Sequence, residues 1–189
     1  QPAQRVVALA PSLTEVLFAV GAGNQVVGRD SFANFPESVK DLPDIGGNNG
    51  VYNYEAITSL KPDLVLATEI NTPDQVNSIE KLGIKVVYLP NPVKLDDTYT
   101  LLSNVAMLTG HTQEAESLIS SLKSRVTAVT EKINQAKSTP LVFYELDGSE
   151  PSKPWTTGAG TFMDQLITMA GGKNAGAVLP EAWGQLSLE

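Results

Sequence analysis

The stretch VVALAPSLTEVLFAVG, residues 6–21, predicts the fold of the chain from its N-terminus. Its first part, Val6–Ala10, is a short apolar run typical of a strand that is buried on both faces of a sheet. Directly after it, Ser12-Leu13-Thr14-Glu15 has the spacing of a capping box, and apolar residues then recur at helical spacing until Gly21. A strand that leads at once into a helix begins a βα unit. We therefore expect an α/β fold with a Rossmann-like lobe and a mostly parallel sheet.

Strand and helix signals continue to alternate after this unit. Short β-branched runs predict four more strands, at Val26–Gly28, Leu64–Ala67, Val86–Leu89 and Leu141–Tyr144. Capping residues, with glycine or proline stops, predict helices that begin after Asn53, at Thr72-Pro73, at about Asp96 and at Thr161. The alternation of strands with helices favours parallel pairing of the strands.

One further helix is distinguished by its length. Residues 112–136 contain no Gly or Pro, and their apolar residues recur at helical spacing. At 1.5 Å per residue, this helix is roughly 36 Å long. It fits a rigid connection between two lobes, and equally a long crossover helix on one sheet. We divide the chain into an N-terminal α/β lobe (1–110), a long connecting helix (111–137) and a C-terminal part (138–189).

The C-terminal part is short for a lobe of its own. We expect one strand at Leu141–Tyr144, a loop from Asp147 to Gly160, and one helix at Thr161–Met169. These elements are too few to bury a core. We therefore expect the start of a second α/β lobe, truncated in this chain.

Composition argues against several classes of function. The chain has 21 acidic and 13 basic residues, a formal net charge of −8 and no cluster of Lys and Arg, so it offers no surface that would follow nucleic-acid phosphates. It has no Cys, which excludes disulfide frameworks and thiolate metal sites. No apolar run reaches the roughly 18 residues of a transmembrane helix, and no stretch has the pattern of a signal peptide.

Motifs for catalysis and cofactor binding are also missing from the sequence. The turn after the first strand has Ala10-Pro11-Ser12 where a dinucleotide fingerprint requires glycines. His111 is the only histidine, so a site with two or three imidazole ligands cannot be built, and no Gly-x-Ser-x-Gly elbow marks a nucleophile. We expect a binding protein that is not an enzyme, with no cofactor and no catalytic or metal-binding residues.

The predicted loops are instead rich in aromatic residues. These residues are Phe32, Phe35, Tyr52, Tyr54, Trp155 and Trp183. Loops outside the carboxyl ends of parallel strands are where α/β sheets bind ligands. Each aromatic side chain alone fits equally well as a plug at the end of the core. Together they predict a site for a large, flat, apolar ligand.

Motifs along the whole chain carry a family resemblance. In the N-terminal half these are APSLTE at residues 10–15, NYEAI at 53–57, LKPDLV at 60–65 and LGIKV at 82–86. In the C-terminal half they are WTTG at 155–158, AGGKN at 170–174 and WGQLSLE at 183–189. In this order they resemble the helical-backbone periplasmic binding proteins, the vitamin B12-, siderophore- and haem-binding components of ABC importers. The resemblance implies two α/β lobes joined by the single long helix.

The resemblance also implies a function and its residues. It implies an extracytoplasmic protein, periplasmic or at the cell surface, which delivers a metal-chelate nutrient to an ABC permease. One glutamate on each lobe docks on the permease in this family, and the matching positions are Glu55 and Glu189. Together with the loop positions above, the resemblance gives the candidate ligand-binding residues Pro11, Ser12, Phe32, Phe35, Asn49, Tyr52, Trp155 and Trp183.

Three chelates remain open as the ligand. Cobalamin-binding members line the cleft with aromatic residues, which favours a corrinoid, although Asn48-Asn49-Gly50 stands where the best-known cobalamin binder has a tryptophan; Tyr52 or Tyr54 would compensate. Haem-binding members use a Tyr or His ligand. Siderophore binders often use arginines, and Arg29 is the sole loop candidate. A chelatase-like α/β enzyme is a distant alternative, against which the lone His111 argues.

Overall fold

Two compact units make up the chain in the computed structural model, which describes residues 1–187 and, of residue 49, the backbone alone. Unit 1 comprises residues 1–91 and 99–120, and unit 2 comprises residues 92–98 and those from 121 onward. The long helix α5 (Thr112–Ile133) therefore contributes to both units, with the change after Ser120. The division into residues 1–110, 111–137 and 138–189 stays a prediction.

Unit 1 is built on a parallel sheet. Its strands are β1 (Val6–Ala8), β2 (Val26–Gly28), β3 (Leu64–Ala67) and β4 (Val86–Tyr88), in the order β2-β1-β3-β4. All neighbouring pairs are parallel. This confirms the predicted α/β fold with a mostly parallel sheet, and the bounds of β2 and β3 are those that the β-branched runs predict. β1 and β4 end earlier than predicted.

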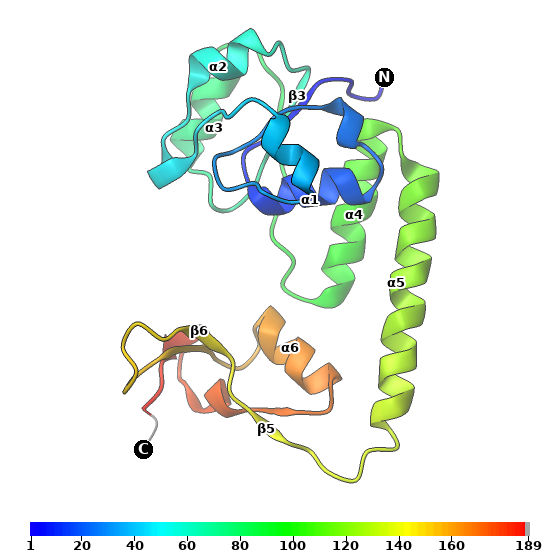
Figure 1. The fold of residues 1–189 in the computed structure, drawn as a ribbon, viewed down its shortest axis with the longest axis vertical. Coiled ribbons are helices and arrows are strands. Elements are labelled where there is room, and N and C mark those ends of the chain that lie inside the picture. The colour runs from blue at the N-terminus through cyan, green and yellow to red at the C-terminus, as the bar shows by residue number, and fades with distance from the viewer. Residues whose placement is uncertain (188–189) are drawn as a thin grey trace. The chain divides into compact units, whose positions relative to one another are not determined.

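Helices cover both faces of this sheet. They are α1 (Pro11–Ala19), α2 (Tyr54–Ser59), α3 (Pro73–Glu80) and α4 (Leu95–Thr109), with 3-10 turns η1 (Gly23–Gln25), η2 (Glu37–Asp41) and η3 (Asn48–Gly50). Val7 and Val65 share a buried cluster with Ile57 of α2 and Ile79 of α3. Figure 1 shows α2 and α3 on one side of β3, and α1 and α4 on the other. Because both faces are covered, the strands β1 and β3 are buried throughout, as their apolar sequences predict.

Local capping explains where the helices of unit 1 begin. The Asn53 side chain accepts the N–H of Ala56 at 2.9 Å and caps α2 as predicted. Thr72 and Gln75 form a complete capping box at α3. The capping box predicted at Ser12 is wrong. The helix α1 begins at Pro11, whose fixed φ suits the first helical position, so the N-cap is Ala10, two residues before Ser12, and no side chain caps the helix.

Unit 2 contains more strands than its sequence predicts. They are β5 (Leu141–Val142), β6 (Glu145–Asp147), β7 (Trp155–Thr157), β8 (Lys173–Asn174) and β9 (Trp183–Gln185), with α6 (Phe162–Met169) and η4 (Ala175–Val178). β5 pairs with β8 in parallel, and β6, β7 and β9 form an antiparallel sheet in the order β6-β7-β9. The prediction of one strand followed by a loop from Asp147 to Gly160 is therefore wrong, because β7 lies within that stretch. In the part of the chain that the structure describes, no helix is both long and apolar enough to cross a bilayer.

Candidate functional site

The loops at the carboxyl ends of the unit 1 strands form the first candidate surface. Pro11 and Ser12 lie here, in the first turn of α1 directly after β1, with Pro11 half-buried and Ser12 exposed. Phe32 and Phe35 follow β2 and are 59% and 62% exposed. Exposed phenylalanines at this edge of a parallel sheet are free to contact a ligand.

Two more apolar side chains share this exposure. Val51 follows η3 and Ile70 follows β3, and they are 70% and 62% exposed. Sequence reasoning missed Ile70, although its place between the end of a strand and the Thr72 cap was readable. We define the apolar edge of unit 1 as Phe32, Phe35, Val51 and Ile70.

Tyr52, in contrast, is a buried residue that holds the loops together. It is 7% exposed, and its hydroxyl donates to the carbonyl oxygen of Leu9 at 2.7 Å and accepts from Nδ2 of Asn71 at 2.7 Å. Burial raises the pKa of its hydroxyl. The hydroxyl is therefore fully used within the chain.

The same network continues along the sheet edge. Asn71 Oδ1 accepts the backbone N–H of Thr68 at 2.9 Å, and the Thr68 hydroxyl donates to Oδ1 of Asn91 at 2.7 Å. Leu9, Thr68 and Asn91 follow β1, β3 and β4 in turn. These hydrogen bonds fix the loops of three parallel strands relative to one another.

A second set of polar contacts fixes the loop that carries the phenylalanines. Arg29 Nη1 lies 3.4 Å from Asp44 Oδ2 and donates to the carbonyl oxygen of Asp30 at 3.0 Å, and its side chain is only 16% exposed. The Ser31 hydroxyl donates to Asp44 Oδ1 at 2.8 Å. The pKa of Asp44 is lowered by the N–H of Gly46 first, and also by Ser31 and Arg29. Nη1 of the Arg29 guanidinium is therefore engaged within the chain, while Nε is buried and has no hydrogen-bond partner among the described residues.

Asp30 is the buried acid of this loop. It is 2% exposed, and Oδ1 accepts the N–H of Phe32 at 2.9 Å, while Oδ2 has no hydrogen-bond partner among the described residues. Burial raises the pKa of the Asp30 carboxyl, although the N–H groups of Phe32 and Ala33 and the charge of Arg29 act in the opposite direction.

In unit 2, the two tryptophans form a second candidate surface. The sequence places both in loops, which is wrong: Trp155 lies on β7 and Trp183 on β9. In the antiparallel pairing, Trp155 is opposite Gln185 and Thr157 is opposite Trp183. Residues directly opposite each other lie on the same face, and positions two apart on one strand do so too. Both indoles are thus on one face of the sheet, diagonally across from each other, and are 42% and 48% exposed.

The other residues that the sequence singles out are Glu55, Asn49, Glu189 and His111. Glu55 lies in the first turn of α2, and its carboxylate has no hydrogen bond or ion pair among the described residues. The backbone of Asn49 lies in η3. Glu189 lies outside the described residues. The only histidine, His111, lies 3.4 Å from Glu114 of α5 through Nδ1.

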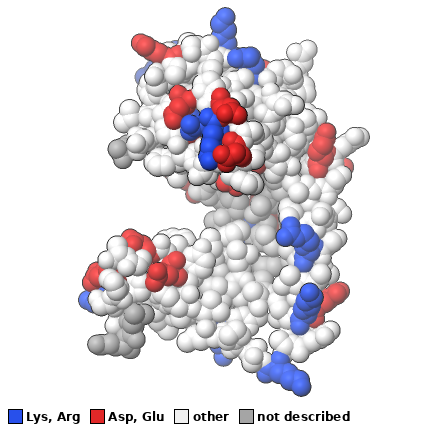
Figure 2. All heavy atoms as spheres, viewed as in Figure 1, with Lys and Arg blue, Asp and Glu red and all other residues white. Residues whose placement is uncertain are grey.

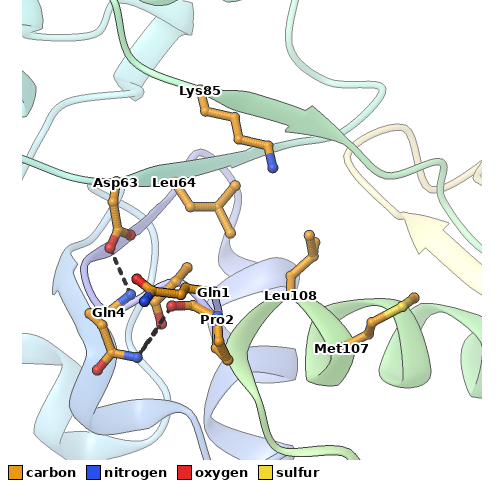
Figure 3. Close-up of a pocket in the computed structure, with 9 residues that line it drawn as sticks. Gln1, Pro2, Gln4, Asp63, Leu64, Lys85, Met107 and Leu108 are labelled. Atoms are coloured by element: carbon orange, nitrogen blue, oxygen red, sulfur yellow. Dashed lines mark hydrogen bonds between the residues drawn. The ribbon is translucent and has the colours of Figure 1, made fainter.

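A cavity of about 560 Å³ lies at the opposite, amino edge of the sheet (Figure 3). Asp63 lines it, and its two carboxylate oxygens accept the N–H groups of Gln4 and Arg5 at 2.8 and 3.0 Å. Gln4 Nε2 donates to the carbonyl oxygens of Pro2 and Ala3. These polar groups anchor the first residues of the chain to the sheet, so we give this cavity no ligand role.

Charged residues are dispersed over the surface. On the face shown in Figure 2, basic side chains are interspersed with acidic ones and form no continuous patch. Lys40, for example, pairs with Glu37 at 2.9 Å. Among the described residues, no group of three or more His, Asp or Glu side chains is placed to hold a metal ion.

Comparisons with known proteins agree on one family. Residues 6–189 match the family described as periplasmic binding protein. A vitamin B12-binding protein of Yersinia pestis (strain Pestoides F) is 30% identical over an alignment of 190 residues, which covers 100% of this chain and 66% of that protein. The chain thus spans slightly less than two thirds of the length of this relative.

Solved structures show the same fold. A periplasmic heme-binding protein from Roseiflexus sp. RS-1 in apo form is 30% identical, with a TM-score of 0.81 over 98% of this chain and 70% of that one. The periplasmic vitamin B12 binding protein of Vibrio cholerae is 23% identical, with a TM-score of 0.80 over 99% of this chain and 71% of that one.

Proposed function

Because the chain belongs to the periplasmic binding protein family, we propose that it is the extracytoplasmic substrate-binding protein of an ABC importer for a large metal chelate, with a corrinoid such as vitamin B12 as the favoured ligand. It binds its ligand and does no chemistry on it, in keeping with a family of binding proteins. The similarity to the Yersinia vitamin B12-binding protein supports this ligand.

The hydrogen bonds that Arg29 and Tyr52 make within the chain favour a corrinoid over the other chelates. Siderophore binders often use an arginine against the chelate, but the Arg29 guanidinium is bound to Asp44 and Asp30. The Tyr52 hydroxyl is likewise engaged by Leu9 and Asn71. What stays exposed is the apolar edge of unit 1 and the Trp155–Trp183 face, which suit a broad apolar macrocycle.

Haem is the second candidate, because of one exposed tyrosine. Tyr88 ends β4 at the carboxyl edge of the sheet and is 50% exposed, so its hydroxyl is free to approach an iron atom. The 30% identical heme-binding protein from Roseiflexus supports this alternative.

Isothermal titration with cyanocobalamin, haemin and ferric siderophores tests the assignment. We expect cyanocobalamin to bind most tightly. If haemin binds most tightly of these chelates, and if its binding is lost in Tyr88→Phe, the ligand is haem and not a corrinoid. Failure of all these chelates to bind better than millimolar would reject the function.

Single substitutions test the two surfaces. We expect Phe35→Ala and Trp155→Ala each to weaken cyanocobalamin binding about tenfold or more, since removing one well-buried aromatic contact costs at least about 1.4 kcal/mol. Met107→Ala is the matched control, because Met107 is 67% exposed and lines the cavity at the amino edge. Equal effects of all three substitutions would reject these surfaces as the binding site.

We further propose that Glu55 docks on an arginine of the ABC permease, and that Glu189 does so as well. A hollow of about 390 Å³ beside Glu55 is lined by Tyr54, Thr58, Ser59 and Leu82. The hydroxyls of Thr58 and Ser59 donate to carbonyl oxygens of their own helix, at 2.8 Å each. An apolar hollow with one unpaired carboxylate suits the aliphatic stem and the charged head of an arginine.

Charge reversal tests the docking. In cells that depend on the importer, Glu55→Lys is expected to reduce uptake at least tenfold and to leave the affinity for the chelate unchanged, because the residue contacts the permease and not the ligand. Glu116→Lys on α5 makes the same charge change at another exposed position and should not affect uptake. Unimpaired uptake by Glu55→Lys would refute the docking role.

A further inference from the structure

A buried polar cluster lies at the end of β7 in unit 2. Asn174 lies at its centre and is 8% exposed. Both the amide nitrogen and the amide oxygen of its side chain are hydrogen-bonded. Nδ2 donates to the carbonyl oxygen of Thr157 at 3.0 Å and to Oδ1 of Asp164 at 3.0 Å. Oδ1 accepts the N–H of Gly176 at 2.9 Å.

Asp164 extends this cluster to the loop between β7 and α6. Its Oδ2 accepts the N–H of Gly160 at 2.8 Å. Its own N–H donates to the Thr161 hydroxyl at 3.2 Å, and that hydroxyl donates to the carbonyl oxygen of Gly158 at 3.1 Å. The Thr157 hydroxyl contacts the Thr161 hydroxyl as well. Asn174 and Asp164 together therefore hold residues 157–161 in place.

Two glycines bring this loop against the neighbouring backbone. A Cβ at Gly158 would lie 2.2 Å from the carbonyl oxygen of Glu181, and one at Gly176 would lie 2.2 Å from that of Thr157. The N–H of Gly158 donates to the carbonyl oxygen of Ala182 at 2.8 Å. The end of β7 is thus fixed beside Ala182, directly before Trp183.

This contact connects the polar cluster to the tryptophan face. The hydrogen bond from Gly158 to Ala182 continues the pairing in which Thr157 is opposite Trp183. A shift by one residue would turn one indole to the other face of the sheet. We infer that Asn174 and Asp164 are positioning residues, which keep Trp155 and Trp183 on one face for the ligand. The ligand part of this inference rests on the proposed function.

Asn174→Asp tests the inference, because it places two carboxylates where a hydrogen bond now joins Asn174 to Asp164. Two carboxylates this close cannot both ionise without strong repulsion, and one takes up a proton as the pH falls. At pH 7.5 we expect cyanocobalamin affinity to fall about tenfold or more, and most of this loss to be recovered near pH 5. A purely structural role in the start of α6 would not give ligand affinity this pH profile.

Tryptophan emission gives a second reading that needs no ligand. The chain has two Trp residues, and both lie in this face, so emission excited selectively from tryptophan reports on this face alone. We expect a red shift in Asn174→Asp at pH 7.5 that reverses near pH 5. Asn134→Asp, at an exposed position after α5, is the matched control and should show neither effect.

The milder Asp164→Asn serves if Asn174→Asp does not fold. Gly160 and Asn174 donate to different oxygens of Asp164, and one of these becomes an NH2 donor in the variant. We therefore expect affinity to fall by a few-fold and emission to shift in the same direction. A folded variant with wild-type affinity and wild-type emission would overturn the inference, and so would losses that do not respond to pH in Asn174→Asp. If the wild-type protein binds none of the chelates, the proposed function fails, and the emission measurements still decide whether the cluster positions the tryptophans.

Discussion

Removing the hydroxyl of Tyr52 is the sharpest test of the network that holds the unit 1 loops. In Tyr52→Phe the ring stays and its packing is preserved, but two hydrogen bonds of 2.7 Å are lost. The Leu9 carbonyl oxygen then keeps only the Asn71 amide at 3.4 Å, and that amide loses its short partner. Leu9 and Asn71 are 1% and 6% exposed, so water does not readily replace the hydroxyl.

The size of the effect follows from these lost partners. Leaving a buried polar group without a partner costs about 1–3 kcal/mol. We expect Tyr52→Phe to lower the free energy of unfolding by about 2 kcal/mol, which shifts the urea midpoint by about 1 M for a typical slope of about 2 kcal/mol per molar.

Urea unfolding followed by far-UV circular dichroism measures this loss, with Tyr88→Phe as the control. Tyr88 is 50% exposed, so removal of its hydroxyl should change the free energy of unfolding by less than about 0.5 kcal/mol. The reasoning is refuted if Tyr52→Phe also stays within about 0.5 kcal/mol of the wild type, or if both substitutions cost the same.

Two more predictions concern stability in unit 1. Asn53→Ala should cost about 1 kcal/mol because it removes a side-chain cap, whereas Ser12→Ala should cost less than about 0.5 kcal/mol, since Ser12 caps nothing; equal urea midpoints would contradict this. Burial raises the folded pKa of Asp30, so the stability contributed by its proton is present below the ordinary carboxyl pKa and is lost as the pH rises through the folded pKa. Asp30→Asn lacks this loss, so its stability relative to the wild type should increase as the pH rises above the ordinary carboxyl pKa of about 4, and a difference that is constant with pH would contradict the assignment.

Local signals were sufficient for most of unit 1, because its elements depend on near neighbours in the sequence. The runs at Val26–Gly28 and Leu64–Ala67 predict their strands to the residue, and Asn53 and Thr72 cap the helices as predicted. The capping box at Ser12 failed because two local signals competed, and the proline at the first helical position prevailed.

In unit 2, the sequence was less informative because the strands there are short and their partners are distant. Trp155–Thr157 is surrounded by Gly, Pro and Ser, which predict a loop, and its partner Trp183–Gln185 is far along the chain. Whether such a segment is a strand depends on pairing that only the folded chain provides. The choice of Trp155 and Trp183 as candidates needed only their residue type, whereas their common face needed the register.

The same distinction separates residues that contact a ligand from residues that support those contacts. Aromatic type alone selects Tyr52 and Phe35 equally, but Tyr52 is buried with its hydroxyl engaged and Phe35 is 62% exposed. If the ligand binds at the apolar edge of unit 1, Phe35→Ala weakens binding by removing contact area and leaves stability nearly unchanged. Tyr52→Phe instead lowers stability and removes no contact area, so any loss of affinity must come from displaced loops. A saturating ligand should offset the loss of stability, because it binds the native arrangement. Affinity and urea stability, measured on both variants, therefore separate the two roles that the sequence alone leaves merged.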